Sequence, residues 1–247
     1  MTLPLFLVDA EVLAGVAAGS TIVLDGAEGR HAASVRRISG GDQVLVSDGQ
    51  GMRATADVVE ARTGALVLRV ARVDADPEPS PRFVLVQALA KGDRDEQAVE
   101  AATELGVDEV VPWQASRSIV VWRGDRAAKS LRKWESVVAA ATKQSRRSRM
   151  PSVSPLVTTR QLADRLRAAE LALVLHEDAA QPLAAQVLPD RGEVVVVVGP
   201  EGGITPDELI ALEAAGAVPV RLGTTVLRSS SAGPAALAVL SAASRWR

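Results

Sequence analysis

The chain contains no cysteine and only two histidines, His31 and His176, among its 247 residues. The absence of cysteine excludes disulfide bonds, thiolate metal sites and a cysteine nucleophile. Two histidines are too few for a multi-histidine metal centre, so we expect no bound metal. Chemistry that depends on a thiol or on a resident metal is therefore not what this sequence predicts.

Long apolar runs are also missing, although 47% of the residues are hydrophobic. No run approaches the length of about 20 residues that a membrane-spanning helix needs. The first residues are apolar, but they lack a basic start and are too short for a secretory signal. The simplest expectation is a soluble, cytoplasmic protein with a substantial core and no membrane association.

Two common nucleotide-binding motifs are absent as well. No G-x-G-x-x-G stands after an early strand, and no G-x-x-x-x-G-K-[ST] loop occurs. These motifs place glycine-rich turns against the phosphates of dinucleotides and of ATP or GTP. Dinucleotide binding of that kind and nucleotide hydrolysis are therefore not predicted.

Basic residues gather in one segment, although the formal net charge of the chain is −2. Between Arg117 and Arg149 there are ten lysines and arginines against two acids, Asp125 and Glu135, which gives this segment +8 and leaves −10 for the rest. Such a one-signed cluster favours docking of a polyanion, and the alternative is a solvated helix face. The candidates for contact with RNA phosphates in this segment are Arg117, Lys143, Arg146, Arg147 and Arg149.

Three prolines at alternate positions within residues 74–81 predict an extended linker. We expect a small β-rich domain over residues 1–74, the linker over 75–82 and a larger domain over 83–247. In the first domain, the patterns predict strands at 20–24, 43–47, 54–59 and 65–70, a hairpin turn at 48–51 and a helix at 29–38. In the larger domain, strands at 82–89, 109–113, 171–175, 193–198 and 218–222 alternate with helices at 94–105, 125–147, 206–215 and 231–246. This alternation predicts an α/β fold with a mostly parallel sheet and helices on both faces.

The most informative stretch is the valine run 194–198, which is followed by Gly199, Pro200, Glu201, Gly202 and Gly203. The run predicts a strand that is buried on both faces. The segment 205–208 then opens a helix with a capping box. Loops at the carboxyl ends of such strands are where open α/β sheets bind ligands. A tight connection without a ligand is the alternative interpretation.

Two other strand ends resemble this one. One carries His176 and Glu177, and the other leads through Leu222 and Gly223 to residues 226–228. If these strands are neighbours in a parallel sheet, their loops meet at one edge. Leu222 and Leu227 could then hold a flat ring while glycine amides bond its edge, which would suit a nucleoside-like cofactor.

The motifs together resemble a known family. The glycine loop with Glu208, followed by Leu222-Gly223-x-x-Val226-Leu227-Arg228, is similar to the SPOUT superfamily of S-adenosylmethionine-dependent RNA methyltransferases. Within it, the chain resembles the bacterial 16S rRNA uridine-N3 methyltransferases. The further motifs that follow the order of that family are His31 with Val35-Arg36-Arg37, Gly41-Asp42, Asp48-Gly49-x-Gly51, Lys91-Gly92-Asp93, Glu104-Leu105-Gly106, Pro112, Arg117-Ser118 and Lys143-Gln144-Ser145-Arg146.

This resemblance implies an N-terminal PUA-like RNA-binding domain and a C-terminal SPOUT domain with a deep trefoil knot. It also implies a homodimer with the cofactor site near the subunit interface. The implied reaction is methylation of N3 of a specific uridine in 16S rRNA of the small ribosomal subunit, with S-adenosylmethionine as cofactor. Carried over by position, the cofactor-binding residues are Leu175, His176, Glu177, Gly199, Pro200, Glu201, Gly202, Gly203, Ile204, Leu222, Gly223, Val226, Leu227 and Arg228.

One departure from the family lies directly after Arg228. The family has a run similar to Thr-Glu-Thr-Ala, whereas this chain has Ser229-Ser230-Ser231-Ala232, so Ser230 stands at the acidic position. A serine can still cap the following helix. Arg228 is the candidate catalytic residue, because a guanidinium suits a planar uracil anion, and its alternative role is an ion pair at a helix start.

The remaining expectations concern RNA. Arg30, Arg36 and Arg37 in the small domain are candidates for a second RNA contact, and Trp122 is the candidate for stacking on a flipped base. A ribose 2′-O-methyltransferase acting on tRNA or rRNA is the alternative enzyme. A non-catalytic RNA-binding factor in ribosome assembly is the alternative from another class.

Overall fold

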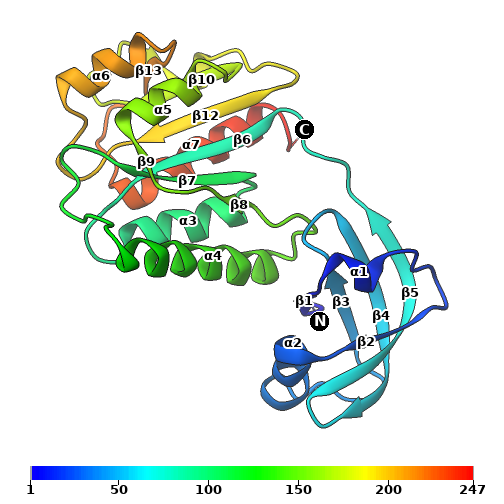
Figure 1. Cartoon of the computed structure of the whole chain (residues 1–247). Coiled ribbons are helices and arrows are strands. Elements are labelled where there is room, and N and C mark those ends of the chain that lie inside the picture. Colours follow the sequence, from blue (N-terminus) through cyan, green and yellow to red (C-terminus); the bar gives the residue numbers. More distant parts are fainter. Residues whose placement is uncertain (1, 247) are drawn as a thin grey trace. The chain divides into compact units, whose positions relative to one another are not determined.

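The computed structural model describes residues 2–246, which form two compact units. The first unit comprises residues up to Glu78 together with Thr142–Met150, and the second comprises Pro79–Ala141 and the chain from Pro151 onward (Figure 1). The sequence did not predict that Thr142–Met150, far along the chain, belongs with the N-terminal unit.

The first unit is built on a five-stranded sheet in the order β1-β3-β4-β5-β2. Its strands are β1 (Leu5–Leu7), β2 (Thr21–Leu24), β3 (Gln43–Ser47), β4 (Met52–Arg62) and β5 (Ala65–Ala75). All pairs are antiparallel except β1 with β3. Alternate residues such as Val44, Val46 and Leu68 are fully buried on one face, and the residues between them point to the other face.

Short helical segments complete the first unit: α1 (Ala10–Leu13), α2 (Gly26–Arg30) and a π-helical turn, η1 (His31–Val35). The predicted hairpin turn joins β3 to β4. Asp48 Oδ1 accepts hydrogen bonds from the amides of Gln50 (2.7 Å) and Met52 (3.0 Å), while Gly49 and Gly51 adopt positive φ. The Asp and Gly residues that predict this turn therefore also stabilise it, through side-chain hydrogen bonds and positive φ.

The second unit contains an eight-stranded parallel sheet in the order β11-β13-β10-β12-β6-β7-β8, with β9 beside β7. Its strands are β6 (Arg82–Ala88), β7 (Glu109–Gln114), β8 (Ser152–Val153), β9 (Val157–Thr158), β10 (Leu171–Leu175), β11 (Gln181–Pro182), β12 (Glu193–Val198) and β13 (Val218–Arg221). The valines of β12 are at most 3% exposed, which confirms the strand that the valine run predicts.

Helices cover both faces of this sheet, as predicted (Figure 1). Helices α3 (Arg94–Glu104), α4 (Asp125–Ser145) and α7 (Ser229–Ala243) contribute to the core on one face, and α5 (Thr159–Leu166) and α6 (Pro206–Glu213) to the core on the other. A 3-10 turn, η2 (Leu183–Ala185), follows β11. Helix α7 lies close to the sheet because Gly233 has no side chain, and a Cβ there would come within 2.8 Å of Leu85.

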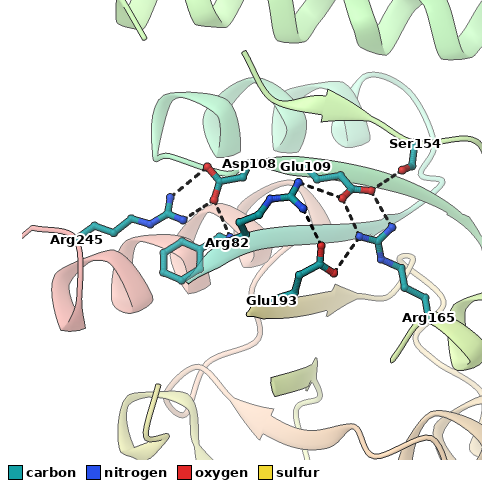
Figure 2. Close-up of polar contacts among 8 residues, drawn as sticks. Arg82, Asp108, Glu109, Ser154, Arg165, Glu193 and Arg245 are labelled. Carbon is teal, nitrogen blue, oxygen red and sulfur yellow. Dashed lines mark hydrogen bonds and ion pairs between the residues drawn. The ribbon is translucent and has the colours of Figure 1, made fainter. Parts of the chain in front are cut away.

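Charged side chains pair at the amino ends of the central strands (Figure 2). Glu109 accepts two hydrogen bonds from Arg165, each 2.8 Å long, and Glu193 and Arg82 extend this cluster. Beside it, Arg245 pairs with Asp108 and lies 3.9 Å from the centre of the Phe83 ring. The charged side chains at this edge of the sheet are therefore paired with partners of opposite charge.

One sequence expectation fails at the core. Trp122 is 7% exposed and packs edge-on against Trp134, with ring centres 5.4 Å apart. A ring enclosed by helix α4 and the sheet core cannot stack on a flipped base, so its proposed role in base stacking is wrong for this structure. Its apolar surface is used in packing instead.

Candidate active site

The three strand ends singled out in the sequence lie together. Strands β13, β10 and β12 are consecutive neighbours and parallel, so their following loops leave the same edge of the sheet. The amide of His176, at the end of β10, donates to the carbonyl of Val220 in β13 (3.0 Å). The expected convergence of the three loops is confirmed. Strand β6, on the other side of β12, brings a fourth loop to the same edge.

The glycine turn after β12 is tightly closed. Gly203 adopts φ +75° and its amide donates to the carbonyl of Pro200 (2.9 Å). A Cβ on Gly199 would lie 2.7 Å from Ile204 Cγ1, and one on Gly202 would lie 3.0 Å from Arg117 Cβ. Close approach of the turn to its neighbours therefore favours glycine at these positions.

The predicted capping box at the start of α6 is present. The Glu208 amide donates to Thr205 Oγ1 (3.2 Å), and the Thr205 amide donates to Glu208 Oε2 (3.1 Å). Glu208 Oε1 also accepts from the Ser116 amide (2.8 Å) and from Thr159 Oγ1 (3.0 Å). Burial alone would raise the pKa of Glu208, but these hydrogen bonds outweigh it and hold the pKa below its usual value. The carboxylate thus fixes the glycine turn to two other segments.

Glu201 joins the glycine turn to the loop after β6. Its Oε1 accepts from the Lys91 amide (3.2 Å) and from Arg94 Nη1 (2.9 Å). Burial would raise the pKa of Glu201, but the hydrogen bonds, including that from Arg94, lower it. The carboxylate therefore stays ionised and orders the loop over Lys91–Arg94.

Arg117 contacts the same turn. Its Nη1 donates to the carbonyl of Gly202 (2.9 Å), and its side chain packs along Gly202. The sequence predicts Arg117 as an RNA contact, whereas the structure gives it a definite bracing contact within the candidate site. That contact involves a long, exposed side chain and a backbone carbonyl, so its net contribution is modest.

The loop after β13 leaves open space and apolar surface. Leu222 is half-buried, Gly223 has positive φ, and a Cβ there would meet no atom within 4 Å. Val226 and Leu227 are 75% and 38% exposed. Neighbouring apolar side chains at the mouth of an α/β sheet suit the binding of a flat ring.

Arg228 stands at the N-cap position of α7, but its side chain makes no capping hydrogen bond. The helix begins at Ser229, two residues earlier than predicted, so the expectation that a serine of this run provides the cap is wrong. Ser230 lies in the first turn instead. With β-region backbone at Arg228, its side chain is left at the surface beside the loop.

A surface hollow of about 440 Å³ lies against Arg228. Its other lining residues come from α7 and from the loop after β6: Ser230, Lys91, Gly92, Asp93, Arg94 and Gln97. Asp93 is the N-cap residue of α3, yet its carboxylate makes no capping hydrogen bond. The sequence contains Lys91-Gly92-Asp93 as a motif but does not predict that it lies in the site. The position of β6 beside β12, which only the sheet order reveals, brings it there.

Three buried side-chain atoms at this edge have no hydrogen-bond partner: Gln87 Oε1, Ser118 Oγ and Ser229 Oγ. Gln87 is fully buried and lies opposite Val198, the last residue of β12. Ser229 is the first residue of α7. Buried polar atoms that lack a partner are costly, so their grouping near the strand ends favours a ligand with polar groups.

The other predicted RNA contacts all lie in the first unit and differ in their surroundings. Lys143 Nζ is 2.7 Å from Glu28 Oε1, and Arg149 donates to the carbonyls of Asp76 (2.8 Å) and Pro77 (3.1 Å). Two other predicted RNA contacts, Arg146 and Arg147, are partly buried. The last three are exposed on either side of η1: Arg30, Arg36 and Arg37.

Residues 2–246 contain neither a membrane-spanning helix nor a cluster of metal ligands. None of the described helices is both long and apolar enough to cross a membrane. Within the same part of the chain, no group of three or more histidine, aspartate or glutamate side chains is arranged to hold a metal ion.

Comparison with known proteins identifies relatives of both units. The family model described as "RNA methyltransferase domain" matches residues 77–241, and that described as "RNA methyltransferase PUA domain" matches residues 24–71. The ribosomal RNA small subunit methyltransferase E of Mycobacterium tuberculosis is 46% identical over 233 residues, which cover 92% of this chain and 89% of the relative.

Solved structures agree with these matches. The ribosomal RNA small subunit methyltransferase E from Neisseria gonorrhoeae, bound to S-adenosyl methionine, is 28% identical with a TM-score of 0.86, and the match covers 98% of both chains. A methyltransferase from Legionella pneumophila, in complex with the same cofactor, is 27% identical with a TM-score of 0.85 and the same coverage. The chain therefore belongs to the RNA methyltransferase family that contains the ribosomal RNA small subunit methyltransferase E proteins.

Proposed function

We propose that this protein transfers a methyl group from S-adenosylmethionine to N3 of a uridine in 16S rRNA of the small ribosomal subunit. The observation that carries this proposal is the meeting of three strand-end loops beside the hollow that Arg228 lines. Family membership supports RNA methylation, and solved relatives bind this cofactor.

The residues present fit such a cofactor. Leu222, Val226 and Leu227 offer apolar surface for the adenine ring, next to open space at Gly223. The unpartnered Gln87 Oε1 and Ser229 Oγ offer hydrogen bonds to polar groups. Once bound, S-adenosylmethionine supplies a methyl group already activated on a sulfonium. The protein has to bind the cofactor and the RNA base, orient them toward each other and exclude water from the site.

The acceptor base would occupy the hollow beside Arg228. Uracil N3 carries a proton of weak acidity, and this proton has to leave as N3 gains the methyl group. The Arg228 guanidinium would stabilise the negative charge that develops on the uracil. Asp93 is the one carboxylate among the residues that line the hollow, and we assign it the role of proton acceptor. Glu201 would hold the Asp93 loop in place through Lys91 and Arg94.

Other parts of the proposal follow from the family resemblance. They are the trefoil knot, a homodimer with the cofactor site near the subunit interface, and action in the cytoplasm. In the same scheme residues 1–74 form a PUA-like RNA-binding domain, residues 75–82 a linker and residues 83–247 the catalytic domain. The basic residues named above would contact phosphates of the substrate.

Nucleoside mass spectrometry of rRNA tests this function. We expect 3-methyluridine after incubation of unmodified small-subunit rRNA with the protein and S-adenosylmethionine. A ribose 2′-O-methylated nucleoside would show the alternative enzyme instead. Tight cofactor binding without any product would contradict catalysis on this RNA, and no cofactor binding at all would favour a non-catalytic RNA-binding factor.

Two variants test the assigned roles in single-turnover reactions. Arg228→Ala should slow methyl transfer by about 10²–10³, the range for loss of one charge-stabilising donor. A near-normal rate in a variant that still binds cofactor rejects that role. Asp93→Asn should slow the reaction most at low pH and least at high pH, where the N3 proton is lost more readily without a base. Asp207→Asn, an exposed acid on α6 outside the hollow, is the control.

A further inference from the structure

A second hollow, of about 690 Å³, lies within the first unit on the outward face of its sheet. Gln43 and Leu45 of β3 and Arg53 and Thr55 of β4 line it. Residues between them, such as Val44 and Ala54, are fully buried. Because side chains alternate along a strand, the hollow lies on the face opposite the core.

Strand register aligns the lining residues in rows. Leu45 of β3 is paired with Thr55 of β4, and Thr55 with Arg72 of β5. One row thus places an apolar side chain, a hydroxyl and a guanidinium side by side across three strands. The next row along places Arg53 opposite Asp74. Leu3, which precedes β1, adds a second apolar side chain.

Positive charge predominates in this hollow. Asp74 Oδ2 is 2.9 Å from Arg72 Nη2 and 3.9 Å from Arg53 Nη2, so one carboxylate serves two guanidinium groups. Arg146 is a third arginine in the lining. The nearest other acid in the rows, Asp57, accepts from Gln43 Nε2 (2.9 Å). The surface therefore favours an anionic partner.

The segment that supplies Arg146 is held in an unusual backbone conformation. Arg146 adopts φ +57°, which costs a non-glycine residue on the order of 1 kcal/mol. Arg53 Nη1 donates to the Arg146 carbonyl (3.3 Å) and so connects the segment to β4. The contact with Arg53 thus helps to maintain this strained conformation beside the hollow.

We infer that this hollow binds a single-stranded segment of the RNA substrate. Guanidinium groups of Arg53, Arg72 and Arg146 contact backbone phosphates, and Leu3 and Leu45 form the apolar surface beneath a base. The inference rests on the proposed function, which requires an RNA substrate. It assigns the main RNA contact of the first unit to the sheet face and not to Arg30, Arg36 and Arg37.

The double variant Arg53→Gln/Arg72→Gln tests this inference in the full-length protein without cofactor. The probe is a labelled single-stranded oligouridylate, and its affinity is measured by fluorescence anisotropy over a series of salt concentrations. We expect affinity to fall about tenfold and the slope of log K against log salt to fall by about 1.4, since each phosphate contact on a single strand contributes about 0.7. Polyglutamate should not compete for the site.

Arg62→Gln is the matched control, because Arg62 lies on the same strand, β4, outside the hollow, and pairs with exposed Glu60 (2.8 Å). It removes one positive charge and should leave both quantities nearly unchanged. Thr55→Glu places a negative charge within the hollow and should reproduce the loss if the double variant unfolds. Circular dichroism melting curves establish that each variant is folded.

The inference is overturned by an unchanged salt slope in folded Arg53→Gln/Arg72→Gln, by an equal loss in Arg62→Gln, or by a larger loss in Arg36→Gln/Arg37→Gln than in the sheet-face variant. Competition by polyglutamate equal to that of RNA would indicate an acidic protein partner and would also overturn it. The product formed by the wild-type protein is measured separately. Failure of the proposed function and failure of this inference are therefore distinguishable.

Discussion

The two edges of the parallel sheet in the second unit are built in opposite ways. At the amino edge, Glu193, Arg82 and Glu109 begin three neighbouring strands, and Arg165 pairs with both glutamates (Figure 2). At the carboxyl edge, strands end in glycine turns, in exposed Val226 and Leu227, and in buried polar atoms without partners.

The amino edge thus contributes to stability, whereas the carboxyl edge retains the capacity to bind a ligand. A carboxylate that is fully paired inside the protein has little capacity to bind a ligand, whereas unpartnered groups and open space retain it. The carboxyl edge is not disordered as a consequence, because Glu201 and Glu208 tie its loops together from outside the hollow. The sheet therefore has one edge that is complete within the protein and one edge that a ligand would complete.

The largest effect on stability is expected when the charge cluster at the amino edge is disrupted. Glu109→Gln removes the main partner of Arg165 and the second partner of Arg82, in a site where the glutamate is 6% exposed. We expect the free energy of unfolding of the second unit to fall by about 3 kcal/mol at neutral pH, as measured by urea denaturation. Asp164→Asn, in an exposed pair with Arg167, should change it by less than about 0.5 kcal/mol.

The pH dependence of this effect has a definite sign. Burial would raise the pKa of Glu109, but hydrogen bonds from Arg165 and Ser154 and the charge of Arg82 lower it overall. The stabilisation is therefore complete above the ordinary glutamate pKa and is lost as pH falls through the lower, folded-state value. Equal pH profiles for wild type and Glu109→Gln would contradict this.

A smaller effect, of opposite sign, is expected near the carboxyl edge. Burial raises the pKa of Asp95 to about 6, although hydrogen bonds from the Ala90 and Glu96 amides partly offset it. The folded protein then binds more protons than the unfolded chain between about pH 4 and pH 6, so this group lowers stability as pH rises through that window. The wild-type protein should thus lose stability on the order of 2 kcal/mol across this window, and Asp95→Asn should not show this loss.

Thermal or urea unfolding at several pH values would measure this effect. Glu100→Gln, an exposed acid on the same helix α3, is the control and should keep the wild-type profile. A wild-type stability that does not fall relative to Asp95→Asn between pH 4 and pH 6 would contradict the prediction.

The smallest effect concerns the bracing of the glycine turn. Arg117→Ala removes the hydrogen bond to the Gly202 carbonyl, worth about 1 kcal/mol, and should weaken S-adenosylmethionine binding by up to about fivefold while lowering stability by no more than about that amount. Calorimetry in the absence of RNA measures this, with Arg123→Ala in the same basic segment as control. Unchanged cofactor affinity together with weaker RNA binding would instead support the RNA contact that the sequence predicts.

Local signals in the sequence predicted much of the second unit. The valine run gave β12, the capping box gave α6, and the alternating pattern gave helices on both faces of a parallel sheet. These features depend on side chains close together in the chain, so that periodicity and capping chemistry are visible without coordinates.

Signals failed where distant segments decide the environment. Trp122 has an aromatic ring of the kind that stacks on bases, but its burial against Trp134 depends on where α4 packs. The sequence also contains no signal that Arg117 of the basic cluster donates to the Gly202 carbonyl, 85 residues away, and its RNA contact stays a prediction. Asp93 lines the hollow beside Arg228, and only the adjacency of β6 to β12 brings its loop there.

The sequence by itself determined the class of the fold, the loops that carry the glycine-rich and Leu-Arg motifs, and the resemblance to RNA methyltransferases, because each of these depends on a contiguous pattern of residues. Tertiary structure alone decided which strands are neighbours, which charges are already paired and which remain available to a ligand. The physical reason is that pairing and burial depend on distances between segments far apart in the chain, and local periodicity contains no information about those distances.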